Sequence, residues 1–170
     1  DASDTATKYQ LFSFFEKCAA DHSDEIVPLL LQLERNTQSY HILSNLVRTV
    51  GLVKPKSKEA ITSLWQIFDD LVEHQHPWVR REIPKALLSF IDLDEEKVFN
   101  LFKKLFEYSP PPQDVTQGSP TLALTFQGRD NENWVFEEAI QAFSKLLSNP
   151  KYAEKAHALG LEVEKNALTE

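Results

Sequence analysis

The sequence predicts an all-α fold, and three observations support this prediction. Apolar residues recur along most of the chain at the spacing i, i+3, i+4, i+7, which places them on one face of an amphipathic helix. Residues that cap or break helices separate these stretches from one another. A short segment also recurs along the chain, which is typical of proteins built from repeated helix pairs. We therefore expect residues 1–170 to form a single helical domain.

The first two helices are separated by a short polar break. An apolar stripe formed by Leu11, Phe14, Phe15 and Cys18 predicts the first helix. His22-Ser23-Asp24 interrupts the pattern, and Asp24 is the predicted N-cap of a second helix over residues 25–34.

Glycine, proline and acidic residues mark the boundaries of the next four helices. Gly51 and Pro55 end the third, and Pro77 stands where a first-turn proline is favoured. Acidic residues that follow Leu93 favour the start of the sixth, because they complement the helix dipole. Pro84 lies inside the fifth helix, where it removes one backbone hydrogen bond and bends the axis. The predicted ranges are 38–52, 56–74, 77–91 and 93–106.

A long loop interrupts the helical pattern at about residues 109–130. It is rich in Pro and Gly, and compact domains rarely contain a loop of about twenty residues. Within it, Leu122, Leu124 and Phe126 alternate with smaller residues, as they do in a strand. Because exposure of three apolar side chains on one face is unfavourable, we expect this part to contact the helices or a partner. Helices are predicted again at 132–148 and 150–166.

An internal repeat connects three of the predicted helices. The segment that starts at Trp78-Val79 matches the one that starts at Trp134-Val135, with Glu at the fifth position and Ala followed by an apolar residue at the end. A weaker third copy starts at Ile42. The offset between Ile42 and Val79 is 37 residues and that between Val79 and Val135 is 56, which differ by about the length of the Pro-rich loop. Without the loop, both offsets would match the length of a helix-pair repeat.

The best copy resembles a HEAT repeat. The segment 64–71 is similar to the first helix of that family, and His76-Pro77-Trp78-Val79-Arg80 is similar to its turn and Val-Arg pair. Ala86-Leu87 resembles the end of its second helix. The resemblance implies a right-handed superhelix of about four antiparallel helix pairs that binds proteins on a curved surface, lined by the second helix of each pair. Residue 1 is Asp rather than Met, so we expect this α-solenoid to be part of a longer protein.

Polar residues of the second helices are therefore the predicted binding residues. They grade from basic to acidic along the stack, which could orient a partner. The alternative at each position is the solvated side of an amphipathic helix. Trp78 and Trp134 occupy equivalent first-turn positions, and we expect them to pack on the preceding helix of their own pair rather than to act as exposed anchors. The predicted binding residues are Asn45, Arg48, Arg81, Lys85, Glu138, Gln141 and Lys145.

Net charge limits the classes of partner. The formal net charge of −8 argues against general binding to a phosphate backbone, which requires an excess of Lys and Arg. The leading hypothesis is a non-catalytic domain for protein–protein interaction in the cytoplasm or the nucleus. The alternative is a module that binds nucleic acid or a peptide tail through the locally basic Arg48, Arg81 and Lys85. No run of about 18 apolar residues occurs, so we expect no membrane-spanning segment.

No group of residues predicts a catalytic site, a metal or a cofactor. His74 and His76 are two residues apart, so they do not share a helix face and are not expected to bind zinc together. We expect a structural or solvent-exposed role for them, because the C-terminus of a helix favours a protonated His. Cys18, the single cysteine, belongs to an apolar stripe and is predicted to be a buried, inert thiol in a reducing compartment. We therefore expect the protein not to be an enzyme.

Overall fold

The computed structural model describes residues 2–109 and 128–167, and within these ranges it contains eight α-helices and no strand. The all-α prediction is confirmed for this part of the chain. The contact predicted for Leu122, Leu124 and Phe126 lies outside the described residues. The helices are α1 (Ala2–Cys18), α2 (Ser23–Arg35), α3 (Tyr40–Val50), α4 (Lys58–Leu71), α5 (Pro77–Leu88), α6 (Glu95–Glu107), α8 (Gly128–Leu147) and α9 (Ala153–Ala167).

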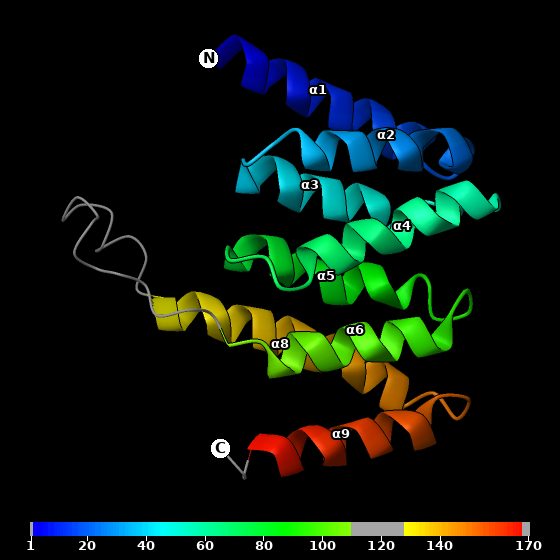
Figure 1. The fold of residues 1–170 in the computed structure, drawn as a ribbon, viewed down its shortest axis with the longest axis vertical. Helices are drawn as coiled ribbons and strands as arrows, with labels where there is room; N and C mark the ends of the chain where they lie inside the picture. The colour runs from blue at the N-terminus through cyan, green and yellow to red at the C-terminus, as the bar shows by residue number, and fades with distance from the viewer. Residues whose placement is uncertain (1, 110–127, 168–170) are drawn as a thin grey trace.

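The helices form two rows that run along the long axis of the molecule (Figure 1). In the first row, α1, α3, α5 and α8 contact one another in this order. In the second row, α2 contacts α4 and α6 contacts α9. Ion pairs of Asp69 in α4 with Lys97 and Lys104 in α6 connect the two halves of this row, at 2.6 and 3.6 Å. The chain therefore alternates between the rows as it descends from the N-terminus to the C-terminus.

One continuous cluster of buried apolar side chains fills the space between the rows. It extends from Phe12 in α1 to Leu159 in α9. Aromatic rings pack at its centre, where Phe68 of α4 lies 5.8 Å from Phe90, which follows α5. Burial of one apolar face per helix is the main source of stability in such a fold.

Several helices begin at a polar side chain that accepts a hydrogen bond from the first turn. Ser57 accepts from the backbone N–H of Ala60, and Asp94 accepts from that of Lys97. The prediction that Asp24 caps α2 is wrong, because the N-cap is His22. Asp24 lies within the first turn instead. Its Oδ1 accepts from the backbone N–H of Lys56 and Ser57, at 2.7 and 2.9 Å, and so connects α2 to the start of α4.

The predicted helix boundaries differ from the observed ones by a few residues. The predicted helices 38–52 and 77–91 end earlier, at Val50 and Leu88. The turns that follow keep Val53 and Phe90 buried, so the apolar period continues beyond the regular helix. In contrast, α8 begins at Gly128 rather than at residue 132, because its apolar stripe starts only near Trp134 and the preceding turn has no periodic signal.

Candidate interaction face of helices α3, α5 and α8

Helices α3, α5 and α8 bury equivalent residues when they are aligned on the predicted repeat. Ile42, Val79 and Val135 are all buried, with exposed fractions of 6, 0 and 6%. The same holds at four further positions, which recur at the helical spacing of an apolar face. These four sets are Leu46, Ile83 and Ala139; Thr49, Ala86 and Ala142; Val50, Leu87 and Phe143; and Val53, Phe90 and Leu146.

Four further positions, which flank the buried stripe, are exposed or half-buried in all three helices, and we call these residues, together with Arg81, the interaction face. No residue of this face is buried. Six of the seven predicted binding residues occupy these shared positions. Arg81 does not, and we include it because it pairs with Glu138 of the same face. The interaction face comprises His41, Trp78 and Trp134; Asn45, Glu82 and Glu138; Arg48, Lys85 and Gln141; Leu52, Ser89 and Lys145; and Arg81.

Arg48 and Lys85 line one pocket of about 320 Å³ between α3 and α5. Glu16 of α1 and Glu82 of α5 line the same pocket, so its four charged side chains balance. Within the described part of the chain, none of these four makes an ion pair. Glu16 was not predicted from the sequence, because it belongs to α1 and no local sequence pattern relates it to the pocket.

Arg81 and Glu138, two of the predicted binding residues, form an ion pair with each other. Arg81 Nη2 lies 3.4 Å from Glu138 Oε1, and this pair joins α5 to α8. The Arg81 guanidinium carbon also lies 5.8 Å from the centre of the Trp134 ring, within the range of a cation–π contact. Trp134 and Glu138 therefore hold one guanidinium between them.

The two tryptophans are more exposed than their predicted packing implies. Trp78 and Trp134 are 41 and 42% exposed. Trp78 makes edge contacts with the rings of Tyr40 and His41 in α3, at centroid distances of 6.3 and 6.0 Å. The reason is geometric, since the N-terminus of α5 lies beside that of α3 in the first row.

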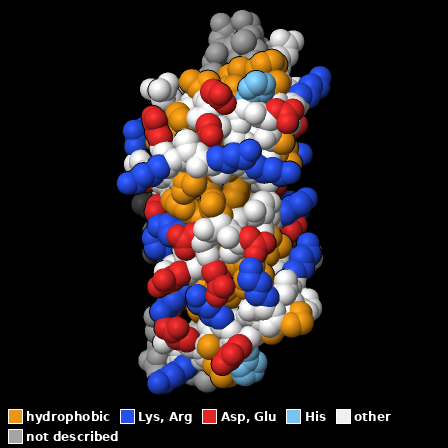
Figure 2. Space-filling model, turned by 90° about the vertical axis from the view of Figure 1, so that its right-hand side faces the viewer, with side chains coloured by type: hydrophobic (Ala, Val, Ile, Leu, Met, Phe, Trp, Pro, Cys, Tyr) orange, Lys and Arg blue, Asp and Glu red, His pale blue; other side chains and the backbone are white. Residues whose placement is uncertain are grey.

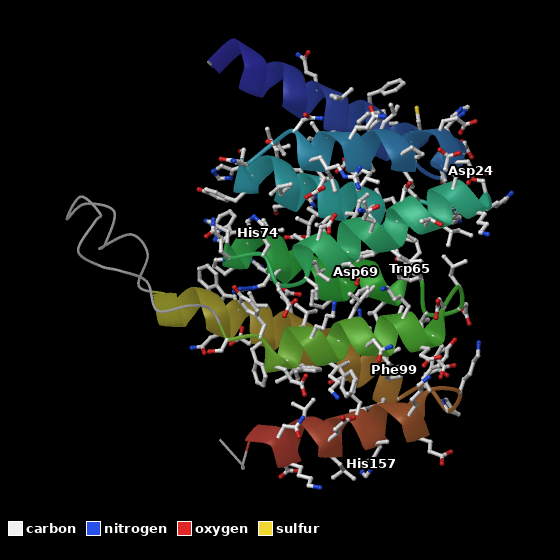
Figure 3. All side chains as sticks on the ribbon, viewed as in Figure 1. Asp24, Trp65, Asp69, His74, Phe99 and His157 are labelled. Atoms are coloured by element: carbon white, nitrogen blue, oxygen red, sulfur yellow. The ribbon has the colours of Figure 1, made fainter. Side chains whose placement is uncertain are left out.

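His74 lies at one edge of the stack (Figure 3), and its Nδ1 accepts a hydrogen bond from the backbone N–H of His76 at 3.0 Å. The His76 ring stacks on Tyr40 at 3.7 Å with an angle of 6°, and its Nδ1 accepts from the backbone N–H of Trp78. The expectation of a charged His is wrong here. Burial, followed by the nearby His74, His41 and Arg80, lowers the pKa of His76 to about 4. Burial also lowers the pKa of His74.

Arg80, the arginine of the HEAT-like Val-Arg pair, has a structural role that the sequence did not indicate. It is only 1% exposed. Its Nη1 donates to the carbonyl oxygen of His74 at 3.1 Å, and its guanidinium carbon lies 4.3 Å from the centre of the Tyr108 ring. It thus joins the α4–α5 turn to the end of α6.

The remaining predictions concern metals, the thiol and membranes. Among the described residues, no three or more His, Cys, Asp or Glu side chains gather closely enough to hold a metal ion. Cys18 is half-buried rather than fully buried, and it packs against the edge of the core. None of the helices in the described part is long and apolar enough to cross a membrane.

Comparisons with family models, with curated proteins and with solved structures find no match for this chain. A hypothesis about its function therefore depends on the geometry and charge of the interaction face.

Along the edge of the stack on which Asp24 lies, acidic and basic side chains are interspersed, with hydrophobic areas between them (Figure 2).

Proposed function

We propose that this chain is a HEAT-like α-solenoid, a right-handed superhelix of helix pairs, that binds another protein through the interaction face. The observation that carries this proposal is the register shared by α3, α5 and α8, in which five equivalent positions are buried in all three helices. Phe136 and Ile140 of α8 depart from it, since they are exposed where the equivalent residues of α3 and α5 are buried. Repeats of this kind place equivalent side chains side by side and so build an extended surface. We propose that it acts as a non-catalytic scaffold in the cytoplasm or the nucleus.

The mixed charge of the interaction face favours a protein over a nucleic acid. Nucleic acid binding depends on several Lys and Arg that neutralise phosphates. Here Arg81 is paired with Glu138, and Glu16 and Glu82 line the pocket that contains Arg48 and Lys85. A surface with both signs of charge complements the similarly mixed surface of a protein.

Charge reversal on and off the interaction face tests the proposal. Lys85→Glu changes an exposed position of the face, whereas Lys58→Glu changes an exposed position at the start of α4 in the second row. The wild-type chain and both variants would be used for affinity capture from a cell extract, followed by quantitative mass spectrometry.

We expect proteins captured by the wild type to be retained by Lys58→Glu and lost with Lys85→Glu. Equal capture by all three chains would contradict the choice of face. Binding of the wild type to a duplex oligonucleotide that weakens steeply with added salt would instead favour the nucleic acid alternative.

A further inference from the structure

The pair Trp134 and Glu138 on α8 has an equivalent on α5. Trp78 and Glu82 occupy the same repeat positions, four residues apart, so both side chains of each pair lie on one helix face. Trp78 and Trp134 are almost equally exposed, and Glu82 and Glu138 are both half-buried. The two pairs therefore present the same chemical groups to the neighbouring helix and to solvent.

The two pairs differ in the residue that faces them from the neighbouring helix of the first row. Arg81 of α5 faces the Trp134–Glu138 pair, with an ion pair at 3.4 Å and a ring contact at 5.8 Å. The repeat places Ser44 of α3 in the position that corresponds to Arg81. The rings of Tyr40 and His41 of α3 contact Trp78 at its edge, and neither carries a guanidinium. Serine is too short and carries no charge, so it cannot reproduce the contacts of Arg81.

We propose that the Trp78–Glu82 pair binds an arginine side chain of the protein partner, in the manner in which the Trp134–Glu138 pair binds Arg81. This inference rests on the proposed function, because it assigns a chemical group to the partner of the same face. Glu82 supplies the negative charge, and Trp78 supplies an exposed aromatic ring. A guanidinium suits both contacts, since it is weakly hydrated, stacks on rings and donates several hydrogen bonds to a carboxylate.

The surroundings of the pair also indicate what accompanies the arginine. Glu16 lines the same pocket as Glu82 and adds a second negative charge. Arg48 and Lys85 line it too, and Lys85 follows Glu82 by three residues, about 5 Å along the helix axis. We therefore expect the partner segment to carry an acidic residue close to the arginine, so that both pairs of charges are complemented.

A small probe tests the site without knowledge of the partner. N-acetyl-arginine methylamide carries the guanidinium, and its citrulline counterpart has nearly the same shape without the charge. Titration of each into the full chain would be followed by NMR of the tryptophan indole N–H groups, assigned by Trp→Phe substitutions. We expect a saturable shift of the Trp78 signal with the arginine probe and none with the citrulline probe.

Variants of the two pairs provide matched controls. Glu82→Gln removes the negative charge of the site, and Ser44→Arg supplies an internal guanidinium that would occupy it. Each variant should reduce the response of Trp78 at least fivefold. Ser44→Gln, which adds a longer side chain without a charge, should not. Arg81→Ala frees the second pair, and we expect Trp134 to respond to the probe only in this variant. Identical Trp78 responses in wild type and Glu82→Gln, or no response of Trp78 at concentrations that shift Trp134 in Arg81→Ala, would overturn the inference. So would the absence of any response in all variants.

Failure of this inference can be distinguished from failure of the proposed function. The same Ser44→Arg and Ser44→Gln variants would be used in the capture experiment. If Lys85→Glu abolishes capture and Ser44→Arg leaves it unchanged, the face binds a protein but the arginine site is wrong. If Ser44→Arg also abolishes capture and Ser44→Gln does not, the partner uses this site.

Discussion

Gly51 and Ala86 meet where the end of α3 passes α5. A Cβ placed on Gly51 would lie 3.2 Å from both the Cα and the Cβ of Ala86 and 3.3 Å from the carbonyl oxygen of Arg48. These distances are shorter than ordinary van der Waals contacts. Gly51 has φ of −62°, so the close approach of the two helices, rather than its backbone conformation, favours glycine here.

We predict that Gly51→Ala destabilises the fold by about 1 kcal/mol, because two of the atoms in its way belong to the backbone and cannot rotate aside. Gly160→Ala is the matched control. A Cβ at Gly160 within α9 meets nothing within 4 Å, and alanine is the better helix former by about 0.5–1 kcal/mol. Urea denaturation should therefore move the two midpoints in opposite directions. A stabilising Gly51→Ala would show that α3 and α5 can separate without cost.

His76 should make stability depend on pH. The pKa of His76 falls from 6.5 in the unfolded chain to about 4 in the folded one. Between these values the unfolded chain binds a proton that the folded chain does not, so stability decreases as the pH falls from about 6.5 to 4. We expect a loss of about 1 kcal/mol between pH 7 and pH 5, reduced by solvent screening because the ring is only partly buried.

His76→Asn tests this assignment, since asparagine can still accept a hydrogen bond at the start of α5 but does not titrate. Urea midpoints would be measured for both proteins at pH 7 and pH 5. The variant should be less stable at pH 7, because it loses the stack on Tyr40, and its midpoint should change less with pH. An equal change in both proteins would assign the pH dependence to other groups.

Asp24 should stabilise the connection between α2 and α4. Its carboxylate accepts from the backbone N–H of Ser57 and Lys56, and these bonds lower its pKa below the usual 3.8. The contribution is present above the unfolded pKa and is lost as the pH falls through the lower folded value. We predict that Asp24→Ala lowers the urea midpoint at pH 7, and that Asp24→Asn lowers it less because the amide oxygen still accepts. Equal losses for both would mean that the charge, and not the hydrogen bonds, matters.

The sequence predicted all eight described helices from the period of their apolar residues. The stripe predicted for α1 is partly wrong, because Leu11 and Phe14 are exposed and Phe12 is buried instead. Some helix ends were missed, for two different reasons. Asp24 bonds to backbone groups of Lys56 and Ser57, which no local pattern reveals. The turn at Gly128 precedes the apolar stripe of α8 and has no periodic signal.

The candidate site was also predicted only in part. The repeat register placed Arg48 and Lys85 on one face, and the structure brings both to one pocket. The pairing of Arg81 with Glu138 was not predicted, because it depends on how closely α5 packs against α8. The exposure of Trp78 was not predicted either, because its ring contacts come from α3, which is distant from α5 in the sequence.

Adjacent residues of α5 should differ sharply in their effect on stability. Ile83 is fully buried, whereas its neighbour Glu82 is half-buried and points to the interaction face. We predict that Ile83→Ala costs about 2–5 kcal/mol, because it removes apolar atoms from a packed core and leaves a cavity. Glu82→Ala should cost no more than about 0.5 kcal/mol, although it removes the proposed arginine site. Urea denaturation measures both values, and comparable losses would contradict the register that defines the face, since a residue directed outward has no core contacts to lose.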